Sequence, residues 1–273
     1  VLASVMERRL GSAPTLVDGP DGPHVHWSAG GAPRVLLLGH HDTVFPAGSC
    51  AERPFTVSDG RATGPGVFDM KAGIVLAVHA VAALADRSGV EILITSDEEV
   101  GSLTSKALVE ERALACGKVL VLEPSADGGA VKTARKGTGT FEMVVHGRAA
   151  HAGLEPEKGI NALVAAAELV GLVPTFADAA KGTTVTPTMA TAGTAENVVP
   201  HEARVTVDVR VEQPDEKERV EAAFAGLASR PAGAVPGARV EVSGGVNRPP
   251  MPSSASVSLF PVAVAAAEAE GLP

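Results

Sequence analysis

Three apolar runs in this sequence end in histidine or acidic residues. They read VLLLGHHD, EILITSDEE and VLVLEP, and a glycine-framed loop, GPGVFDMKAG, carries a further aspartate. Short branched runs of this kind are typical of buried strands, and the carboxyl ends of parallel strands meet at one edge of a sheet, where ligands bind. We therefore expect five side chains to converge there: His40, Asp69, Glu98, Glu99 and Glu123.

Carboxylates gathered at one sheet edge repel one another and lose solvation. A divalent cation removes that repulsion, and a set of imidazole and carboxylate ligands suits zinc. Each residue alone has an ordinary explanation: a histidine satisfied in the core, a turn aspartate, or an acid where the chain reaches the surface. All of these explanations would have to hold together at matching strand ends, so the pattern favours a metal site, with zinc or with cobalt or manganese in its place.

Because side chains alternate between the two faces of a strand, the two adjacent histidines are expected to point to opposite faces. His40 and Asp42 point to the same face, and His41 points to the other. His40 can therefore bind metal through one ring nitrogen while Asp42 holds the second nitrogen. His41 is expected to be a packing or rim residue.

Glu98 and Glu99 also face apart, so one of them can bind metal while the other reaches the attacking water. The segment Ser96-Asp97-Glu98-Glu99 precedes an expected helix, however, and is equally a good acidic helix cap. The residues alone leave this choice open.

The order of the expected elements divides the chain. Strands alternate with helices up to residue 137, which predicts an α/β domain with a largely parallel sheet. Residues 138–247 follow the order β-α-β-β-α-β of a ferredoxin-like unit and read as an inserted domain. Residues 246–250 are expected to form a linker, and 248–273 to begin the return to the first domain. The expected strands lie at 35–38, 90–95, 118–122, 140–146, 183–191, 203–211 and 238–243, and the expected helices at 71–86, 103–114, 159–173, 215–229 and 255–270.

The composition of the chain argues against some classes of binding partner. The chain carries 23 basic and 32 acidic residues, a formal charge of −9, and only 3% aromatic residues. This argues against nucleic acid or an anionic membrane as a partner. The longest apolar helix-like run is too short to span a bilayer, and no signal peptide opens the chain. Cys50 and Cys116 lack metal-ligand spacing, which is typical of reduced thiols in a cytoplasmic protein.

Seven motifs occur in a fixed order over nearly the whole chain: GHHDTV, GPGVFDMKAG, TSDEEVGS, LEPS, GRAAHAG, ENVVP and DVR. Together they resemble the di-zinc metallopeptidase family of glutamate carboxypeptidase, acetylornithine deacetylase, succinyl-diaminopimelate desuccinylase, aminoacylase and peptidase T. The segments GPGVFDMK, DGGAVKTARKG and NRPPM are most similar to glutamate carboxypeptidase. The resemblance implies an α/β zinc-peptidase catalytic domain with an inserted α+β lid and dimerisation domain.

The resemblance also implies roles for the residues at the sheet edge. His40, Glu123 and Glu99 would bind two zinc ions that Asp69 bridges. Glu98 would be the general base, and Asp42 would orient His40.

Three residues of the inserted domain match family positions that contact substrate. His151 resembles the histidine that polarises the scissile carbonyl, often across a dimer. Asn197 and Arg210 resemble the contacts to the substrate carboxylate, a task that suits the planar fork of arginine. Taken alone, Arg210 is a charge on a surface strand and His151 is a loop residue.

One family feature has no counterpart here. Family members carry a last zinc-binding histidine near the C-terminus, and none of the remaining histidines of this sequence stands in that context. We therefore expect the zinc site that contains Glu99 and Asp69 to lack a ligand, and the last strands of the catalytic sheet to be absent, as in a fragment of a longer protein.

These observations predict a zinc-dependent hydrolase that cleaves an amide bond to release an amino acid. It would be of the carboxypeptidase or N-acyl amino acid deacylase type, with C-terminal glutamate favoured, and a cytoplasmic homodimer acting on a substrate with a free carboxylate. The alternative is a truncated, non-catalytic relative that binds metal or amino acids or serves as a dimerisation module. A phosphate loop GxxxxGK[ST] and a serine-hydrolase elbow GxSxG are both absent from the sequence.

Overall fold

The computed structural model describes residues 1–228 and 235–272. It divides into two compact units, unit 1 (Val1–Ala130) and unit 2 (Val131–Pro273). The division falls before residue 137, and the domain boundaries expected at 137 and 247 stay predictions. In the part of the chain that the structure describes, no helix is long and apolar enough to cross a membrane.

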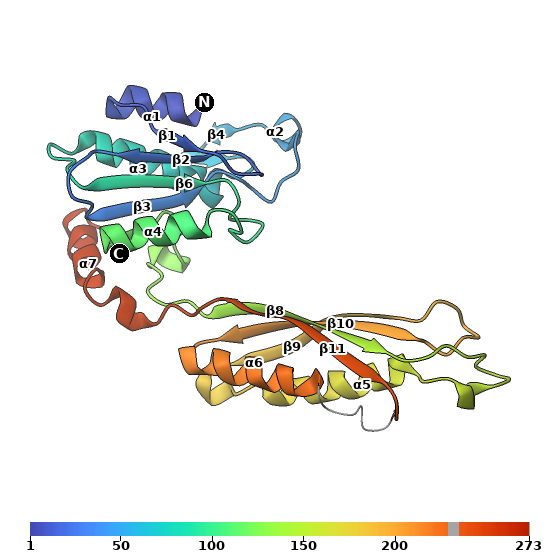
Figure 1. The fold of residues 1–273 in the computed structure, drawn as a ribbon. Helices are drawn as coiled ribbons and strands as arrows, with labels where there is room; N and C mark the ends of the chain where they lie inside the picture. Colours follow the sequence, from blue (N-terminus) through green and yellow to red (C-terminus); the bar gives the residue numbers. More distant parts are fainter. Residues whose placement is uncertain (229–234, 273) are drawn as a thin grey trace. The chain divides into compact units, whose positions relative to one another are not determined.

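Unit 1 is built around a five-stranded sheet in the order β1-β2-β6-β3-β7 (Figure 1). Its strands are β1 (Thr15–Val17), β2 (His24–Ser28), β3 (Val35–His40), β6 (Val90–Thr95) and β7 (Val119–Val121), beside a separate hairpin of β4 (Thr56–Ser58) and β5 (Arg61–Thr63). The α/β class is confirmed, but the sheet is mixed rather than largely parallel. β3 pairs in parallel with β6 and β7, whereas β2 pairs antiparallel with β1 and β6. The reason is local, because β1 and β2 follow each other through a short turn, and such a hairpin is antiparallel.

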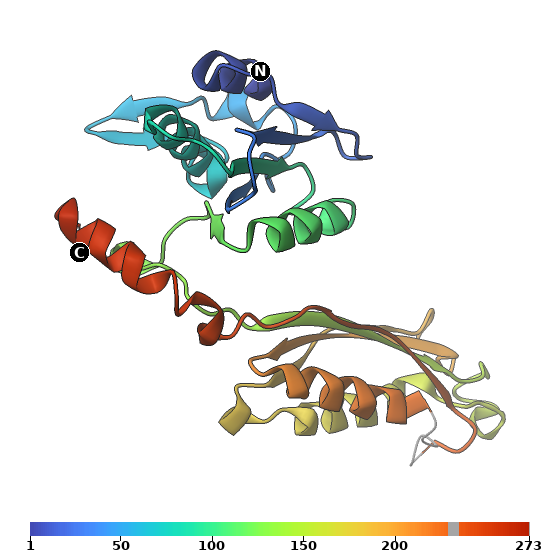
Figure 2. The ribbon, with the colours of Figure 1, turned by 60° about the vertical axis from the view of Figure 1, so that its left-hand side comes forward.

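Helices cover both faces of this sheet. α1 (Leu2–Leu10) and α3 (Ala72–Ala83) lie on one side and α4 (Lys106–Cys116) on the other, with the short α2 (Ser49–Glu52) in a loop (Figures 1 and 2). Alternation along β6 explains the two cores, since Ile92 and Ile94 pack against α3 while Leu93 packs against α4. The sheet is therefore the middle of three layers, as helices on both faces of parallel strands require.

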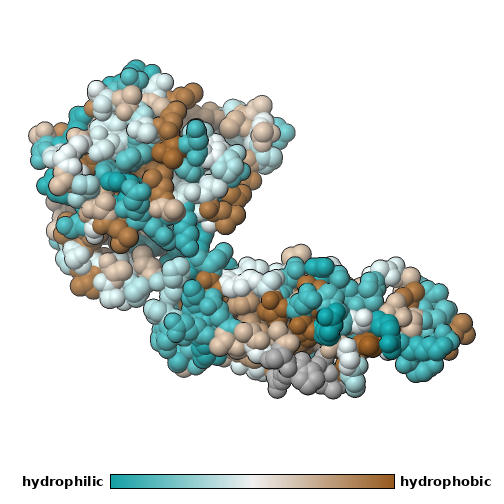
Figure 3. All heavy atoms as spheres, viewed as in Figure 1, coloured by the Kyte–Doolittle hydropathy of each residue, from teal (hydrophilic) through white to brown (hydrophobic). Residues whose placement is uncertain are grey.

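Apolar side chains reach the surface at the β7 edge of the sheet. Leu120 and Val121 are 45% and 58% exposed, although they belong to a strand whose sequence predicts full burial. Apolar patches are visible on the surface of both units (Figure 3).

Unit 2 contains a four-stranded antiparallel sheet in the order β11-β8-β10-β9. Its strands are β8 (Gly137–His146), β9 (Thr184–Ala192), β10 (Glu202–Val211) and β11 (Arg239–Arg248), and its helices are α5 (Ala162–Leu172), α6 (Pro214–Ala228) and α7 (Phe260–Ala269). α5 and α6 pack on one face of the sheet (Figure 2). Residue 229, the expected end of the helix at 215–229, lies outside the described residues.

The alternating burial of residues along β10 explains why both helices pack on the same face of the unit 2 sheet. Its odd-numbered residues from Ala203 to Val211 are buried, and its even-numbered residues point away from the helices. Phe141 of β8 stacks on Phe224 of α6 with ring centroids 3.9 Å apart, which closes the core between sheet and helices.

The expected linker at 246–250 is wrong in its first half, because β11 continues to Arg248. A Cβ atom at Gly244 would collide with the carbonyl oxygen of Thr140 in β8. Glycine therefore allows the backbone of β11 to approach β8 closely, just after residue 243, where the strand was expected to end.

Glu216 of α6 is a fully buried acid in unit 2. Its carboxylate accepts hydrogen bonds from Lys181 Nζ (2.8 Å), Thr183 Oγ1 (2.8 Å) and the guanidinium of Arg219 (2.6 Å). The hydrogen bonds from Arg219 outweigh the opposing effect of burial, and with those from Lys181 and Thr183 they lower the pKa of Glu216 to about 2.

We expect Glu216→Gln to lower the free energy of unfolding at pH 7 by on the order of 2 kcal/mol, because it removes the charge that Arg219 and Lys181 face. A lowered pKa stabilises the fold above the unfolded value near 4.5, and that stabilisation disappears as pH falls toward 2. Urea titrations between pH 7 and 3 should show the two proteins converging. The exposed Glu218→Gln is the control, and a gap that stays constant with pH would contradict this account.

Candidate active site

The carboxyl ends of the three parallel strands lie side by side in unit 1. β3 is the middle strand, with His40 in register with Thr95 of β6 and Leu38 in register with Val121 of β7. The backbone N–H of Leu122 also donates to the carbonyl of Leu38 at 2.9 Å, which aligns the residues just after β7 with the end of β3. Residues that follow these strands therefore share one edge.

His40 is at the centre of this edge and is 2% exposed. Its Nε2 atom lies 3.1 Å from Asp69 Oδ1 and 3.5 Å from Glu123 Oε1. One ligand atom from each of the three residues lies within 4.8 Å of the others, a spacing that one metal ion can bridge. The structure thus brings together three of the four expected metal ligands.

Asp42 lies against the other ring nitrogen of His40. Nδ1 is 3.2 Å from the backbone carbonyl of Asp42 and 3.3 Å from its carboxylate atom Oδ1. Oδ1 is buried and makes no hydrogen bond within the described residues, while Oδ2 accepts one from the N–H of Glu99 at 2.9 Å. Asp42 can therefore fix the orientation of the ring, although its role stays a prediction.

The charges around His40 are unbalanced. Burial lowers the pKa of His40, but the carboxylates of Asp42, Glu123, Glu98 and Asp69 together raise it above its ordinary value. Within the described residues, His40 is the only cationic side chain paired with Asp42 or Asp69. The group is thus a cluster of acids that attracts positive charge, as a cation site requires.

Glu99 does not join the three-residue cluster. Its Oε1 atom accepts a hydrogen bond from the N–H of Val44 at 3.2 Å, and its own N–H binds Asp42. Glu98 is close enough to His40 for its charge to raise the pKa of the ring. Both are half-buried, and neither contact decides which binds metal.

Asp97, which the sequence analysis did not single out, holds the turn that precedes α4. It is fully buried, and its Oδ2 atom accepts hydrogen bonds from the N–H of Thr104 (2.7 Å), the hydroxyl of Thr104 (2.7 Å) and the N–H of Ser105 (3.1 Å). Burial alone would raise the pKa of Asp97, but these bonds outweigh it and lower the pKa to about 2. α4 begins at Lys106 rather than at residue 103, and its N-cap Ser105 receives no side-chain capping bond.

Tight packing fixes the loop that carries Asp69. The N–H of His40 donates to Met70 Sδ at 3.3 Å, and Met70 is 1% exposed. One turn further, a Cβ atom at Gly73 would collide with the carbonyl of Leu122, which directly precedes Glu123. Gly73 is therefore the point where the start of α3 meets the end of β7, and it sets the spacing between Asp69 and Glu123.

His151 and Asn197 lie close together in unit 2. The N–H of Ala152 donates to the carbonyl of Asn197 at 2.9 Å, and His151 forms an isolated bridge with Val198. Both residues are exposed. They lie near the start of β10, because the neighbouring Gly147 donates to the carbonyl of His201 at 2.7 Å.

Arg210 is near the opposite end of β10. Eight residues separate it from Glu202, which corresponds to about 26 Å along an extended strand. Unit 2 therefore does not bring Arg210 together with His151 and Asn197.

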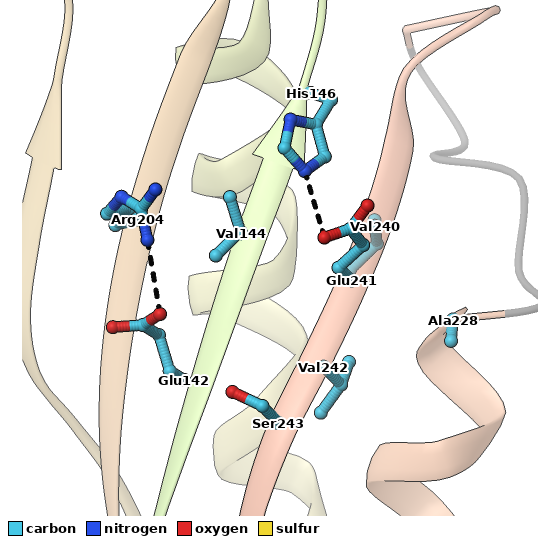
Figure 4. Close-up of a pocket in the computed structure, with 9 residues that line it drawn as sticks. All are labelled: Glu142, Val144, His146, Arg204, Ala228, Val240, Glu241, Val242 and Ser243. Atoms are coloured by element: carbon cyan, nitrogen blue, oxygen red, sulfur yellow. Dashed lines mark hydrogen bonds and ion pairs between the residues drawn. The ribbon is translucent and has the colours of Figure 1, made fainter.

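A pocket of about 590 Å³ lies on the helix-free face of the unit 2 sheet (Figure 4). Its charged residues are paired, with Arg204 Nη1 3.2 Å from Glu142 Oε1 and His146 Nε2 3.3 Å from Glu241 Oε2. None of the predicted site residues lines it.

Comparison with known proteins agrees with this geometry. Residues 133–236 match the family model described as the peptidase dimerisation domain. Carboxypeptidase G2 from Pseudomonas sp. (strain RS-16) is 36% identical over 186 residues, covering 66% of this chain and 45% of that protein. Succinyl-diaminopimelate desuccinylase from Methylobacterium nodulans is 32% identical over 218 residues, covering 70% of this chain and 54% of that protein.

The chain is a homologue of the M20 peptidases. Its fold is also that of the aminopeptidase PepT from Bacillus cereus, with a TM-score of 0.78, 23% identity, and coverage of 98% of this chain and 76% of PepT. The resemblance to this peptidase family that the motifs indicated is therefore confirmed. The chain spans about half the length of the curated relatives it matches.

We expect Gly73→Ala to weaken metal binding, because the added methyl group forces α3 away from Leu122 and separates Asp69 from Glu123. Overpacking of this kind costs about 1–3 kcal/mol, so zinc affinity should fall roughly tenfold or more. Titration with zinc against a chromophoric chelator measures the change. Gly171→Ala in α5, where a Cβ atom meets nothing within 4 Å, is the control. Equal zinc affinity in both variants would contradict the proposed spacing role of Gly73.

Proposed function

We propose that the protein to which this chain belongs is a metal-dependent amidohydrolase that releases an amino acid with a free carboxylate. The observation that carries this proposal is the convergence of His40, Asp69 and Glu123, with Asp42 on the far side of the imidazole ring. The names of the relatives support hydrolysis of an amide bond, since they are carboxypeptidases, peptidases and desuccinylases.

The residues fit a divalent cation, and zinc suits their mixture of imidazole and carboxylate ligands. His40, Asp69 and Glu123 would hold the ion, and the buried, unbonded Oδ1 atom of Asp42 is placed to stabilise the ring of His40 when it binds. A bound zinc would polarise the scissile carbonyl and make water acidic enough to react near neutral pH. Glu99 remains our proposed ligand for a second ion.

Glu98 is our proposed general base. Glu99 is tied by hydrogen bonds to Asp42 and Val44, while Glu98 is half-buried and its charge acts on His40. In this position it would take a proton from the attacking water and pass it to the leaving amine.

Arg210 and Asn197 are our proposed contacts for the carboxylate of the substrate. Arginine presents a rigid fork that pairs with a carboxylate through two parallel hydrogen bonds. A C-terminal glutamate is the favoured residue, by analogy with the similarity to carboxypeptidase G2.

The separation within unit 2 supports a homodimer in which the two chains complete each other's sites. A small substrate held by Arg210 cannot also reach His151 of the same chain, about 26 Å away along β10. The match to a peptidase dimerisation domain suggests the source of the second histidine. We therefore propose that His151 and Asn197 act on the substrate bound by the partner chain, in a cytoplasmic enzyme.

We expect Glu98→Gln to reduce kcat by at least about a hundredfold while zinc content stays unchanged, because general-base catalysis contributes roughly 10²–10⁴-fold. The assay uses N-acyl amino acids and dipeptides with free carboxylates, on the complete gene product with added zinc. Glu110→Gln, an exposed change on α4, is the control. Chelation should abolish wild-type activity and zinc should restore it. Undiminished turnover by Glu98→Gln would remove this residue as the base.

The dimer proposal predicts complementation between two inactive variants. His151→Ala and Glu98→Gln should each be inactive, but a mixed dimer contains one site with an intact Glu98 and the intact His151 of the other chain. Unfolding and refolding an equal mixture should therefore restore about a quarter of wild-type activity. A monomer in sedimentation, or no recovery from a mixture shown to form mixed dimers, would contradict action across the dimer.

A further inference from the structure

Asp208 and Arg210 form an ion pair on the helix-free face of β10. The intervening Val209 is buried against the helices, so the residues on either side of it point together to the opposite face. Arg210 Nε lies 2.9 Å from Asp208 Oδ1, and Arg210 Nη2 lies 2.9 Å from Asp208 Oδ2. Both oxygens of the carboxylate are thus engaged by one edge of the guanidinium group.

This pairing leaves the other edge of the guanidinium group open. Arginine has five N–H donors in a fixed plane, and Asp208 engages the side edge formed by Nε and Nη2. Within the described residues, Arg210 makes no other side-chain hydrogen bond or ion pair. The end edge, formed by Nη1 and the second hydrogen of Nη2, therefore remains able to bind a second carboxylate in bidentate fashion.

A neighbouring pair on the same strand shows the contrast. Arg204 Nε donates to Glu202 Oε1 at 3.0 Å, also two residues apart, but Arg204 Nη1 donates in addition to Glu142 Oε1 at 3.2 Å. Figure 4 shows the second of these pairs. Arg204 therefore donates hydrogen bonds to two carboxylates, whereas Arg210 donates to the carboxylate of Asp208 alone among the described residues.

The residues that pair with Arg210 and Asp208 across the sheet are uncharged, and the next acid along the chain, Glu212, lies 3.8 Å from Lys136 Nζ. The register partners of Arg210 are Thr138 of β8 and Thr184 of β9, and those of Asp208 are Thr140 and Thr186. These neighbours are uncharged and carry hydroxyl groups that can donate hydrogen bonds to an incoming anion.

We propose that Asp208 is a positioning residue that holds the guanidinium group of Arg210 with its end edge toward the carboxylate of the substrate. This inference rests on the proposed function, because it takes Arg210 as the carboxylate contact. The hydrogen bonds that Arg210 donates to Asp208 also raise the pKa of Arg210, which agrees with a fully charged, firmly held group.

Asp208 has two opposing effects on the affinity of Arg210 for a carboxylate, and these effects differ in size. Holding the arginine in one orientation removes rotamer freedom that ligand binding would otherwise have to restrict, an effect of about tenfold in affinity. The negative charge of Asp208 repels a carboxylate on the opposite edge, about 6–7 Å away, by at most about threefold in water. Positioning therefore outweighs repulsion, and removal of the charge should weaken binding.

The test compares the binding of two probes in a Glu98→Gln background that does not hydrolyse them. N-acetyl-L-glutamate carries the free α-carboxylate, and its α-amide lacks it. Isothermal titration should show that Asp208→Asn weakens binding of the acid about tenfold and leaves binding of the amide unchanged. Glu202→Gln, which alters the matched pair on the same strand, should change neither.

The proposal would be overturned if Asp208→Asn bound the acid as tightly as the parent or more tightly. It would also be overturned if the variant lost equal affinity for the acid and the amide, or if the parent protein bound both probes equally well. Asp208→Ala is the second variant and should behave as Asp208→Asn does, with unfolding midpoints close to the parent's. In the hydrolytic background, the same variants should raise KM and leave kcat unchanged. A protein that binds the acid as expected yet hydrolyses nothing would refute the proposed function and leave the positioning role standing.

Discussion

The mutual repulsion of carboxylates around one buried imidazole is the constraint on which the rest of unit 1 depends. Two carboxylates about 5 Å apart at a protein surface repel by roughly 3 kcal/mol, and four of them act on His40. A single imidazole among four carboxylates can offset only part of that repulsion. The fold nevertheless holds the groups together through β3, the Met70 contact and the close approach at Gly73, as a site for an external cation requires.

The two faces of the unit 2 sheet differ in composition and in role. Alternating valines on β10 build the core with α5 and α6, and the opposite face carries charge pairs and threonines. The groups proposed to act on substrate lie near opposite ends of this strand. A strand is a rigid spacer, so the distance between them is fixed, and two chains become necessary if both groups are to act on one small molecule.

The sequence was sufficient to predict the strands of the site, because their apolar runs end sharply in polar residues. Residues 90–95 are predicted and observed as one strand, whereas the strand predicted at 35–38 continues to His40 as β3. The extension of β11 through Gly244 and Gly245 beyond the expected end at residue 243 was not predictable, because glycine weakens a strand unless the close approach of β8 requires it.

The role of Asp97 was also beyond the reach of sequence alone. It is one of four consecutive polar residues, and only the turn that brings Thr104 and Ser105 back to its carboxylate distinguishes it. The antiparallel start of the sheet follows from a short hairpin that the alternation of strands and helices did not reveal. In each case a contact that forms only in the folded chain decided the outcome.

The most direct test of the account is the zinc stoichiometry of the chelator-stripped protein after equilibration with zinc and gel filtration. Elemental analysis should find at least one zinc per chain in the wild type and in Glu110→Gln, and substantially less in Asp69→Asn and Glu123→Gln. A wild-type protein without stoichiometric zinc, or variants that retain as much as the wild type, would contradict the claim that a cation resolves the repulsion at this sheet edge.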